Sequence, residues 1–297
     1  MTIEDVSRHL GLHWHTIKEI DKRNLSVKYK KPRLRDVEYL AIDEIAYKKG
    51  HKYKTIVYDL SAGRAVYVGE GRKAKSLDTF WKRLHSSGAR VKAVATDMWE
   101  PYWSSVSKNV PNAKVVFDLF HIVKQYNKDL DHLRVQLYKS EPDKRKRNII
   151  RGSKWMVLKN ETNLSDDKNP RTHLTPREHL DLALSINQPL ATAYYMKENL
   201  KLIWQQKDYQ SGLETFEYWC QQADESGIEM LQKFAEKLRY YKPGILNWYH
   251  HPISTGKLEG FNNKIKVLKR KAYGYRDDDY FALRILSLHD TRHALMR

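Results

Sequence analysis

The sequence predicts an α/β protein in which a mixed β-sheet is covered by helices and followed by a long helical insertion. Three observations support this prediction. Three strand-like segments follow one another between residues 37 and 71, and two more then alternate with helical segments up to residue 120. Residues 122–250 are almost continuously helical in pattern. At 297 residues and 41% apolar content, the chain can bury one large core or two modest ones.

The amino-terminal segment, residues 1–34, is predicted to form two short helices, at residues 3–11 and 13–23. Its apolar positions have the spacing of a helix-turn-helix: Val6, Leu10, Leu12, Ile17 and Ile20. Any helical hairpin can show this spacing, so a DNA-reading role also depends on the charge of the chain. No further helix precedes the pair, and we therefore expect the remnant of a helix-turn-helix domain.

Residues 37–121 are predicted to form the sheet. Antiparallel strands are expected at 37–47, 53–61 and 62–71 because turn residues separate these apolar segments. A helix at 76–89 capped by Ser76, a strand at 91–97, a helix opened by Pro101 and a strand at 113–120 complete the order βββαβαβ. Three antiparallel strands followed by parallel strands that alternate with helices are the order of the ribonuclease H-like fold.

Two aspartates occupy notable places in this predicted sheet. Asp43 lies in the middle of the first strand among apolar neighbours, and Asp97 ends the fourth strand. These strands are neighbours in the ribonuclease H-like arrangement, so the two carboxylates can face each other. Such a pair needs a cation to offset its repulsion, and oxygen ligands favour Mg²⁺, with Mn²⁺ as a substitute. The alternatives are a solvated strand acid at Asp43 and a turn or capping acid at Asp97.

Two bound ions about 4 Å apart can activate an attacking oxygen and stabilise the leaving one in phosphoryl transfer. A third carboxylate for such a site is expected on the helix that follows Gly256, where Glu259 lies two turns from Lys266. Residues 257–276 contain seven Lys or Arg residues and Glu259 as their one acid. The alternative is an ordinary exposed glutamate on a basic helix.

The charge of the chain indicates a polyanionic partner. Lys and Arg number 54 against 36 Asp and Glu, a formal charge of +18, which favours nucleic acid over a membrane surface. No apolar run suits a membrane span, the amino terminus lacks the apolar core of a signal peptide, and Cys220 is the single cysteine. A soluble protein of a reducing compartment is therefore predicted. The residues predicted to bind DNA are Lys257, Lys264, Lys266, Lys269, Arg270, Lys271, Arg145, Lys146 and Arg147.

Several neighbours of the acids have two interpretations. Glu44 is expected to point away from Asp43, because consecutive strand residues face opposite sides. Trp99, which follows Asp97, is interpreted as a packing residue, with stacking on an unpaired base as the less favoured alternative. For Asp118 and His121, at the end of the fifth strand, a structural hydrogen bond and a role in orienting DNA or the metal site are equally favoured.

Four stretches, at residues 39–53, 94–102, 115–124 and 251–285, resemble the DDE-type transposases of bacterial insertion sequences, specifically the ISL-three-like group. The resemblance implies a ribonuclease H-like core with a helical insertion before the final acid. It also implies catalytic, metal-binding roles for Asp43, Asp97 and Glu259, and it matches Asp118 and His121 to a D-x-x-H pattern. Mg²⁺, double-stranded DNA (terminal repeats and target), a dimer on DNA and a nucleoid-associated location in the bacterial cytoplasm follow as expectations.

The predicted domains are a helix-turn-helix remnant at 1–34, a catalytic core at 35–125 and 252–297, and a helical insertion at 126–251. Members of the group are longer and begin with a cysteine-rich segment, so a truncated copy or a late start is expected here. The favoured function is DNA strand cleavage and strand transfer. The alternatives are a ribonuclease H-like nuclease without the joining step and a non-catalytic DNA-binding fragment that represses the intact transposase.

Overall fold

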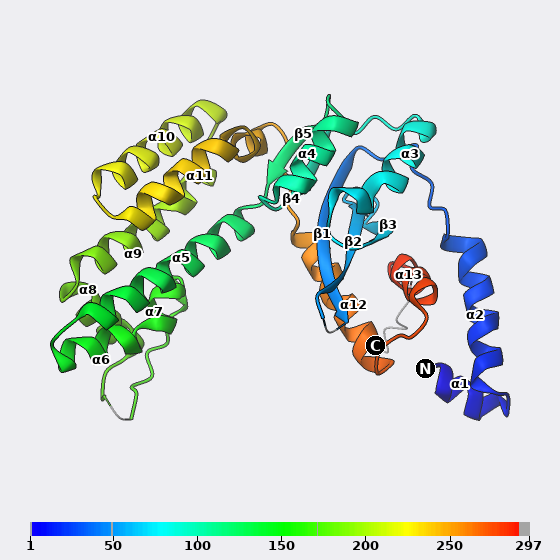
Figure 1. The fold of residues 1–297 in the computed structure, drawn as a ribbon, viewed down its shortest axis with the longest axis horizontal. Coiled ribbons are helices and arrows are strands. Elements are labelled where there is room, and N and C mark those ends of the chain that lie inside the picture. The colour runs from blue at the N-terminus through cyan, green and yellow to red at the C-terminus, as the bar shows by residue number, and fades with distance from the viewer. Residues whose placement is uncertain (1, 49, 171, 291–297) are drawn as a thin grey trace. The chain divides into compact units, whose positions relative to one another are not determined.

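The computed structural model describes residues 2–48, 50–170 and 172–290, and the chain divides into two compact units (Figure 1). The core unit comprises Met1–Asp118 and His251–Arg297, and the helical unit comprises Leu119–His250. The helical unit is therefore an insertion in the sequence of the core unit.

A five-stranded sheet forms the centre of the core unit within the described residues, in the order β3-β2-β1-β4-β5. Its strands are β1 (Tyr39–Lys48), β2 (Lys52–Asp59), β3 (Arg64–Glu70), β4 (Ala93–Thr96) and β5 (Lys114–Phe117). β2 pairs with β1 and β3 in antiparallel fashion, whereas β4 pairs with β1 and β5 in parallel. The predicted mixed sheet of the ribonuclease H-like fold is confirmed.

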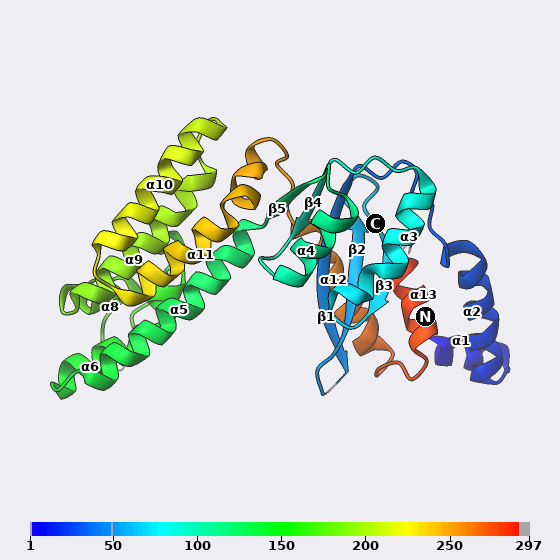
Figure 2. The ribbon, with the colours of Figure 1, turned by 45° about the horizontal axis from the view of Figure 1, so that its top comes forward.

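The two faces of the sheet are covered by different helices (Figure 2). Ala41, Ile45 and Tyr47 of β1 share a buried cluster with residues of α12 (Gly256–Lys271) and α13 (Asp278–Leu286). Alternate residues of a strand face opposite sides, so Leu40 and Ile42 are buried on the other face. That face carries α3 (Asp78–Ser87) and α4 (Glu100–Asn109), which are joined by a 2.8 Å hydrogen bond from Trp81 Nε1 to Ser105 Oγ.

Two expected element boundaries differ in the structure. Ser76 does not cap a helix: it lies in a 3₁₀ turn, η1 (Ala74–Leu77), its hydroxyl donates to the Lys73 carbonyl at 2.6 Å, and α3 begins at Asp78. The turn places Ser76 beside Thr55 of β2, with 2.9 Å between the hydroxyls. The fifth strand ends at Phe117, because Leu119 already begins the next helix. Pro101 lies in the first turn of α4 as predicted.

The amino-terminal helices α1 (Ile3–Leu10) and α2 (Trp14–Tyr29) are separated at Gly11, which has a left-handed φ of 64°. Ion pairs join α2 to Asp277, the residue that caps α13. The Nζ atoms of Lys18 and Lys22 lie 2.7 and 2.8 Å from Asp277 Oδ2. α1 contains no buried residue, and Ile17 is the buried residue of α2. Charged contacts rather than a large apolar interface therefore hold this helical pair.

The helical unit is all-helical in its described residues, as predicted. Tyr126 packs edge-on against Phe234, with 4.9 Å between ring centroids, and the buried Lys197 donates to the carbonyls of Val157 and Lys159 at 2.7 and 2.6 Å. The 3₁₀ turns are η2 (Glu161–Asn163), η3 (Lys201–Trp204) and η4 (Asn247–Tyr249). Its helices are α5 (Leu119–Ser140), α6 (Lys144–Gly152), α7 (Lys154–Leu158), α8 (Pro176–Ser185), α9 (Gln188–Leu200), α10 (Tyr209–Glu225) and α11 (Glu229–Leu246).

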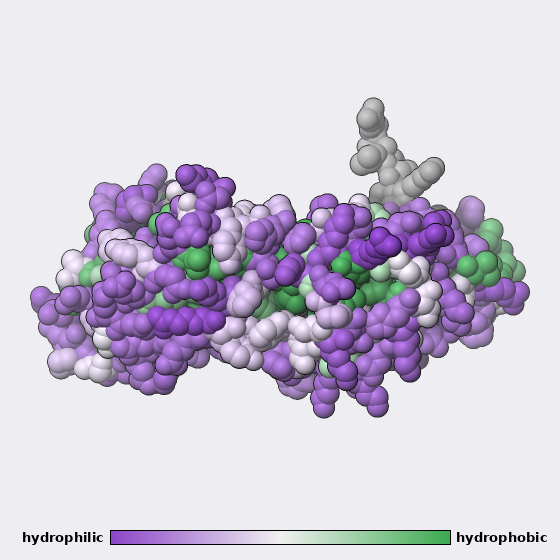
Figure 3. Space-filling view, turned by 90° about the horizontal axis from the view of Figure 1, so that it is seen from above, coloured by the Kyte–Doolittle hydropathy of each residue, from purple (hydrophilic) through white to green (hydrophobic). Residues whose placement is uncertain are grey.

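The face of the protein drawn in Figure 3 is mainly polar. Most of the face in Figure 3 is coloured hydrophilic, in line with the 54 basic and 36 acidic residues of the chain. Among the described helices, none combines the length and the apolar character that a membrane span requires.

Candidate catalytic centre and nucleic-acid surface

Asp43 and Asp97 meet at the junction of two neighbouring parallel strands. The register of β1 and β4 pairs Leu40 with Val94 and Ala41 with Ala95. Asp43 lies two residues beyond Ala41 within β1, and Asp97 is the first residue after β4, which ends at Thr96. Adjacent parallel strands lie about 4.8 Å apart, and paired residues face the same side. The neighbouring strands thus place Asp43 and Asp97 near the same end of β4, close enough for the charge of Asp43 to raise the pKa of Asp97.

The pKa of Asp97 shows how close the negative charges are. Burial, followed by the charges of Glu44 and Asp43, raises the pKa of Asp97 to about 7. A weak contact with the Thr96 hydroxyl, at 3.5 Å, acts in the opposite direction. The ionised form of Asp97 thus lies among like charges in a poorly solvated place. An arrangement of this kind is typical of a site that a cation occupies.

Glu44 belongs to this electrostatic centre although it faces the other side of β1. It pairs with Thr55 of β2, and Thr55 hydrogen bonds Tyr102 of α4 at 3.1 Å between the hydroxyls. Asp43 faces α12 instead, as its contact with Asn262 shows. The expectation that the two side chains point apart therefore agrees with the structure. Even so, the charge of Glu44 raises the pKa of Asp97 more than the charge of Asp43 does.

Asn262 of α12 is a residue of the site that the sequence did not single out. Its Nδ2 donates a 2.8 Å hydrogen bond to Asp43 Oδ2, while Asp43 Oδ1 accepts from the Glu44 backbone N–H at 2.8 Å. The Asn262 side chain is almost fully buried, at 5% exposure. Its Oδ1 has no hydrogen-bond partner in the part of the chain that the structure describes. The one available signal was its position, three residues after Glu259 on the same helix.

Glu259 lies in the first turn of α12 and is exposed. Helical residues three apart are neighbours on one face, at about 5–6 Å, so Glu259 lies one turn from the residue that contacts Asp43. The buried stripe of Leu258, Phe261 and Ile265 fixes this face of α12 beside the sheet. Across residues 2–48, 50–170 and 172–290, however, no three His, Cys, Asp or Glu side chains are grouped as a metal site. The role of Glu259 as third ligand stays a prediction.

Asp118 fastens the start of α12 to the end of β5. Its Oδ2 accepts hydrogen bonds from the Thr255 backbone N–H at 2.6 Å and from the Thr255 hydroxyl at 2.5 Å, and both residues are buried. This is the structural hydrogen bond that was one of the two expectations for Asp118. We call Asp43, Glu44 and Asp97 the acidic centre. Because α12 carries Glu259 and Asn262, the same bond also positions these two residues beside the acidic centre. His121 lies in the first turn of α5, in the helical unit.

The predicted DNA-binding residues of α12 form a basic surface beside β1. Lys266, Lys269 and Arg270 line a cavity of about 330 Å³ whose apolar wall includes Ile45 and Phe281. Lys257 reaches the Leu60 carbonyl at 3.2 Å, and Lys264 and Lys271 are exposed. This surface continues from the face of α12 that contacts Asp43.

The second basic group lies on α6 of the helical unit. The Asp143 carboxylate caps α6 by accepting from the backbone N–H groups of Arg145 and Lys146 at 2.7 and 2.9 Å. Arg147 donates to the Glu141 carbonyl at 2.9 Å. All three side chains are exposed, so their charges face solvent.

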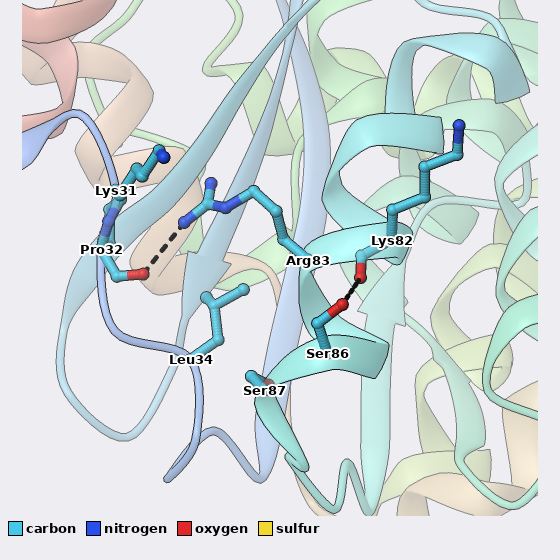
Figure 4. Close-up of a pocket in the computed structure, with 7 residues that line it drawn as sticks. All are labelled: Lys31, Pro32, Leu34, Lys82, Arg83, Ser86 and Ser87. Carbon is cyan, nitrogen blue, oxygen red and sulfur yellow. Dashed lines mark hydrogen bonds between the residues drawn. The ribbon is translucent and has the colours of Figure 1, made fainter.

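A further basic hollow lies between the segment after α2 and α3 (Figure 4). Arg83 points across it and donates to the Pro32 carbonyl at 3.0 Å. Its volume is about 420 Å³, and its lining residues are Lys31, Pro32, Leu34, Lys82, Arg83, Ser86 and Ser87. None of these is a carboxylate, so this hollow is separate in chemistry from the acidic centre.

The acidic centre fits a hard divalent cation. Its donors are carboxylate oxygens, with the Asn262 amide oxygen buried nearby, and Mg²⁺ and Mn²⁺ prefer such ligands. The charges that act on Asp97 come from Glu44 and Asp43 and are both negative, so a bound cation would offset them.

Comparison with known proteins shows the family of this chain. Residues 40–285 match the model of a transposase family, the ISL-three-like DDE transposases. The chain belongs to that family. This transposase is 39% identical over 286 residues to the transposase of insertion sequence element IS1001 from Bordetella parapertussis, covering 95% of this chain and 68% of the relative. It is 24% identical to the transposase of element IS1557 from Mycobacterium tuberculosis, covering 96% of this chain and 68% of that protein.

Among solved structures, the transposase is similar to the Drosophila P element transposase strand transfer complex. The TM-score is 0.44 at 10% identity, with 86% of this chain and 77% of that chain covered. Family membership makes the protein an enzyme of DNA transposition, and enzymes of this family use divalent metal.

Proposed function

We propose that this transposase cleaves DNA at the ends of its insertion sequence and joins the freed 3′ hydroxyl to target DNA, in the bacterial cytoplasm at the nucleoid. Asp43, Asp97 and Glu259 hold two Mg²⁺ ions, for which Mn²⁺ can substitute. The observation that carries the proposal is the parallel pairing of β1, which contains Asp43, with β4, which Asp97 directly follows, where burial and the charges of Glu44 and Asp43 raise the pKa of Asp97 to about 7.

Each residue has a defined task in this proposal. Asp43 and Asp97 bind the cations with their carboxylates, and Glu259 completes the set from α12. Bound divalent ions stabilise the negative charge that develops on the attacking and leaving oxygens of phosphoryl transfer. Asn262 orients Asp43, and Asp118 holds α12 in place through Thr255. The basic residues of α12 bind the phosphates of the duplex beside this centre.

The partners follow from the same chemistry. Terminal repeats and target DNA are both double-stranded, and each must reach the acidic centre. Two element ends have to be cut and joined in a coordinated way, so we propose a dimer of the chain on DNA.

The test is cleavage and joining on a duplex that carries the repeats flanking the gene, with Mg²⁺ or Mn²⁺. Asp43→Asn, Asp97→Asn and Glu259→Gln preserve shape and remove the charge that binds a cation, so each is expected to lose nearly all cleavage. DNA binding in Ca²⁺ is expected to persist, because the basic surface is unchanged. Glu100→Gln is the matched control: Glu100 is an exposed acid in the first turn of α4, and this variant is expected to retain activity.

A substrate with a pre-cut end and a free 3′ hydroxyl separates a transposase from a nuclease. Joined products are expected on this substrate, whereas a nuclease would only hydrolyse it. Full cleavage by the Asp97→Asn variant would contradict the assigned role of this carboxylate.

A further inference from the structure

A second constellation of functional groups lies on the opposite face of the sheet from Asn262. Arg72, which follows β3 and Gly71, places its guanidinium carbon 4.5 Å from the centroid of the Tyr53 ring and 5.9 Å from that of the Trp99 ring. Trp99 is two residues beyond Asp97 and is 41% exposed. We call these three side chains the arginine platform.

The backbone of the platform is held in place by several hydrogen bonds. The Gly71 N–H donates to the Tyr53 carbonyl at 2.8 Å, and the Thr55 hydroxyl donates to the Gly71 carbonyl at 2.8 Å. Gly71 has a φ of 86°, which a residue with a side chain rarely adopts. Trp99 Nε1 completes the arrangement by donating to the Arg72 carbonyl at 3.4 Å. Arg72 therefore extends from a fixed turn.

The platform borders the acidic centre. Thr55, which anchors Gly71, pairs with Glu44 on β1 and hydrogen bonds Tyr102. The charges of Glu44, Asp97 and Asp43 all act on Tyr102. The buried side chains of Thr55 and Tyr102 thus connect the turn that carries Arg72 to the part of the sheet that carries the acids.

Arg72 makes no ion pair with a carboxylate among the residues that the structure describes. Stacking on aromatic rings orients a guanidinium while leaving its N–H groups at the edge available. Those groups match two oxygens of a phosphate, with short charge-assisted hydrogen bonds. The carboxylates of the acidic centre repel DNA phosphate. A guanidinium held in place beside them therefore supplies the positive charge that a phosphate needs in order to bind there.

We propose that Arg72 binds one phosphate of the DNA strand that enters the catalytic centre, with the exposed Trp99 ring covering the adjoining nucleotide. This inference rests on the proposed function, because that function places a DNA strand at Asp43 and Asp97. It adds a site for the strand beside the cut, separate from the basic surface of α12.

The experiment replaces single phosphates of the terminal-repeat duplex with neutral methylphosphonates and measures binding in Ca²⁺, which avoids cleavage. For the wild-type protein, one replacement next to the cut is expected to weaken binding about tenfold, the size of a charge-assisted contact. In Arg72→Ala that replacement has no further effect, whereas replacements at other phosphates still weaken binding. Such non-additivity identifies the phosphate that the side chain contacts.

Arg90→Ala is the matched control. Arg90 is exposed on the segment between α3 and β4, and its loss changes the net charge by the same amount. This variant is expected to keep the wild-type pattern at every phosphate. Arg72→Lys retains the charge without the planar fork and is expected to recover only part of the effect. Trp99→Phe is expected to bind more tightly than Trp99→Ala, because a ring is kept.

Two results would overturn the inference: an Arg72→Ala pattern identical to wild type, or a coupled phosphate far from the cut. An Arg72→Ala protein with an unchanged melting temperature excludes unfolding as the cause of a loss. Failure of the proposed function is a different outcome, since it appears as unaffected cleavage in Asp97→Asn. The coupling between Arg72 and a phosphate is measured by binding alone and is decided in either case.

Discussion

The side-chain amide of Asn262 donates a 2.8 Å hydrogen bond to the carboxylate of Asp43, and this bond joins α12 to the centre of the sheet. Asn262 is buried, so the amide has little freedom to turn away. The bond fixes one carboxylate oxygen of Asp43, and the Glu44 backbone N–H donates to the other at 2.8 Å, so the whole carboxylate has a defined orientation. Groups that orient metal ligands in this way affect the metal site without being ligands themselves.

Asn262→Ala is therefore expected to weaken divalent-metal binding and cleavage by about 10- to 100-fold, the range seen when a supporting residue of a metal site is removed. Metal binding is measured by calorimetric titration with Mn²⁺, and cleavage on the terminal-repeat duplex. Asn263→Ala is the control, because Asn263 is the exposed neighbour that accepts from Lys266 at 3.2 Å. Equal metal affinity in the two variants would contradict the orienting role.

The raised pKa of Asp97 predicts a pH dependence of stability in the metal-free protein. The folded-state pKa of about 7 lies above the ordinary value of 3.8, so the folded protein holds this proton more tightly. The stabilising contribution is fully present below about pH 4 and is lost as the pH rises through 7. Chemical denaturation at pH 5 and pH 8 is expected to show this loss in wild type and not in Asp97→Asn.

Glu44→Gln sharpens that test. The charge of Glu44 is the larger of the two carboxylate contributions to the raised pKa of Asp97, so removing it is expected to shift the stability transition to lower pH. Saturating Mg²⁺ is expected to stabilise wild type at pH 8 and to have little effect on Asp97→Asn. A metal-free wild-type protein that is equally stable at pH 5 and pH 8 would refute the electrostatic account.

The contact between Asp118 and Thr255 predicts coupled effects of two substitutions. Asp118→Asn and Thr255→Val each remove part of one hydrogen-bonded unit, and each is expected to lower the free energy of unfolding by about 1–3 kcal/mol. The double variant is expected to be less destabilised than the sum of the single variants. Both single variants are also expected to slow cleavage, because α12 carries Glu259 and Asn262. Additive losses of stability would show that the two side chains act independently.

Salt dependence separates the two basic groups. Replacing Lys266, Lys269, Arg270 and Lys271 by Ala removes cations beside the acidic centre and is expected to flatten the salt dependence of DNA binding, by about one unit of slope for each phosphate that is no longer bound. The corresponding replacement of Arg145, Lys146 and Arg147 measures the contribution of the helical unit. Fluorescence anisotropy of a labelled duplex over a salt series gives both slopes. Binding that is indifferent to salt would exclude a phosphate-dominated interface.

The strand order and the positions of Asp43 and Asp97 were predictable from the sequence, because both follow from local patterns. The consecutive apolar residues before Asp43 identify β1, and a charged residue directly after the apolar strand β4 marks the end of that strand. Asn262 was not predictable in this way, since an amide on a basic helix has no distinctive pattern until the facing side chain is known. The arginine platform joins residues from β2, the turn after β3 and the turn after β4, and only the paired sheet brings them together. The prediction that Ser76 caps a helix was wrong, because Ser76 lies in a 3₁₀ turn. There its hydroxyl donates a hydrogen bond to the Lys73 carbonyl and lies beside Thr55.

The bond between Asp118 and Thr255 has a topological consequence. Asp118 is the last residue of the core unit before the helical unit, and it is hydrogen bonded to Thr255, four residues after the chain returns to the core unit at His251. The core unit thus joins the two ends of the insertion by its own hydrogen bond. The entropic cost of closing a loop between two such points increases only slowly with the length of the loop. We therefore expect the core unit to accept insertions of other sizes between Asp118 and Thr255 without a change in the path of the strands that carry Asp43 and Asp97.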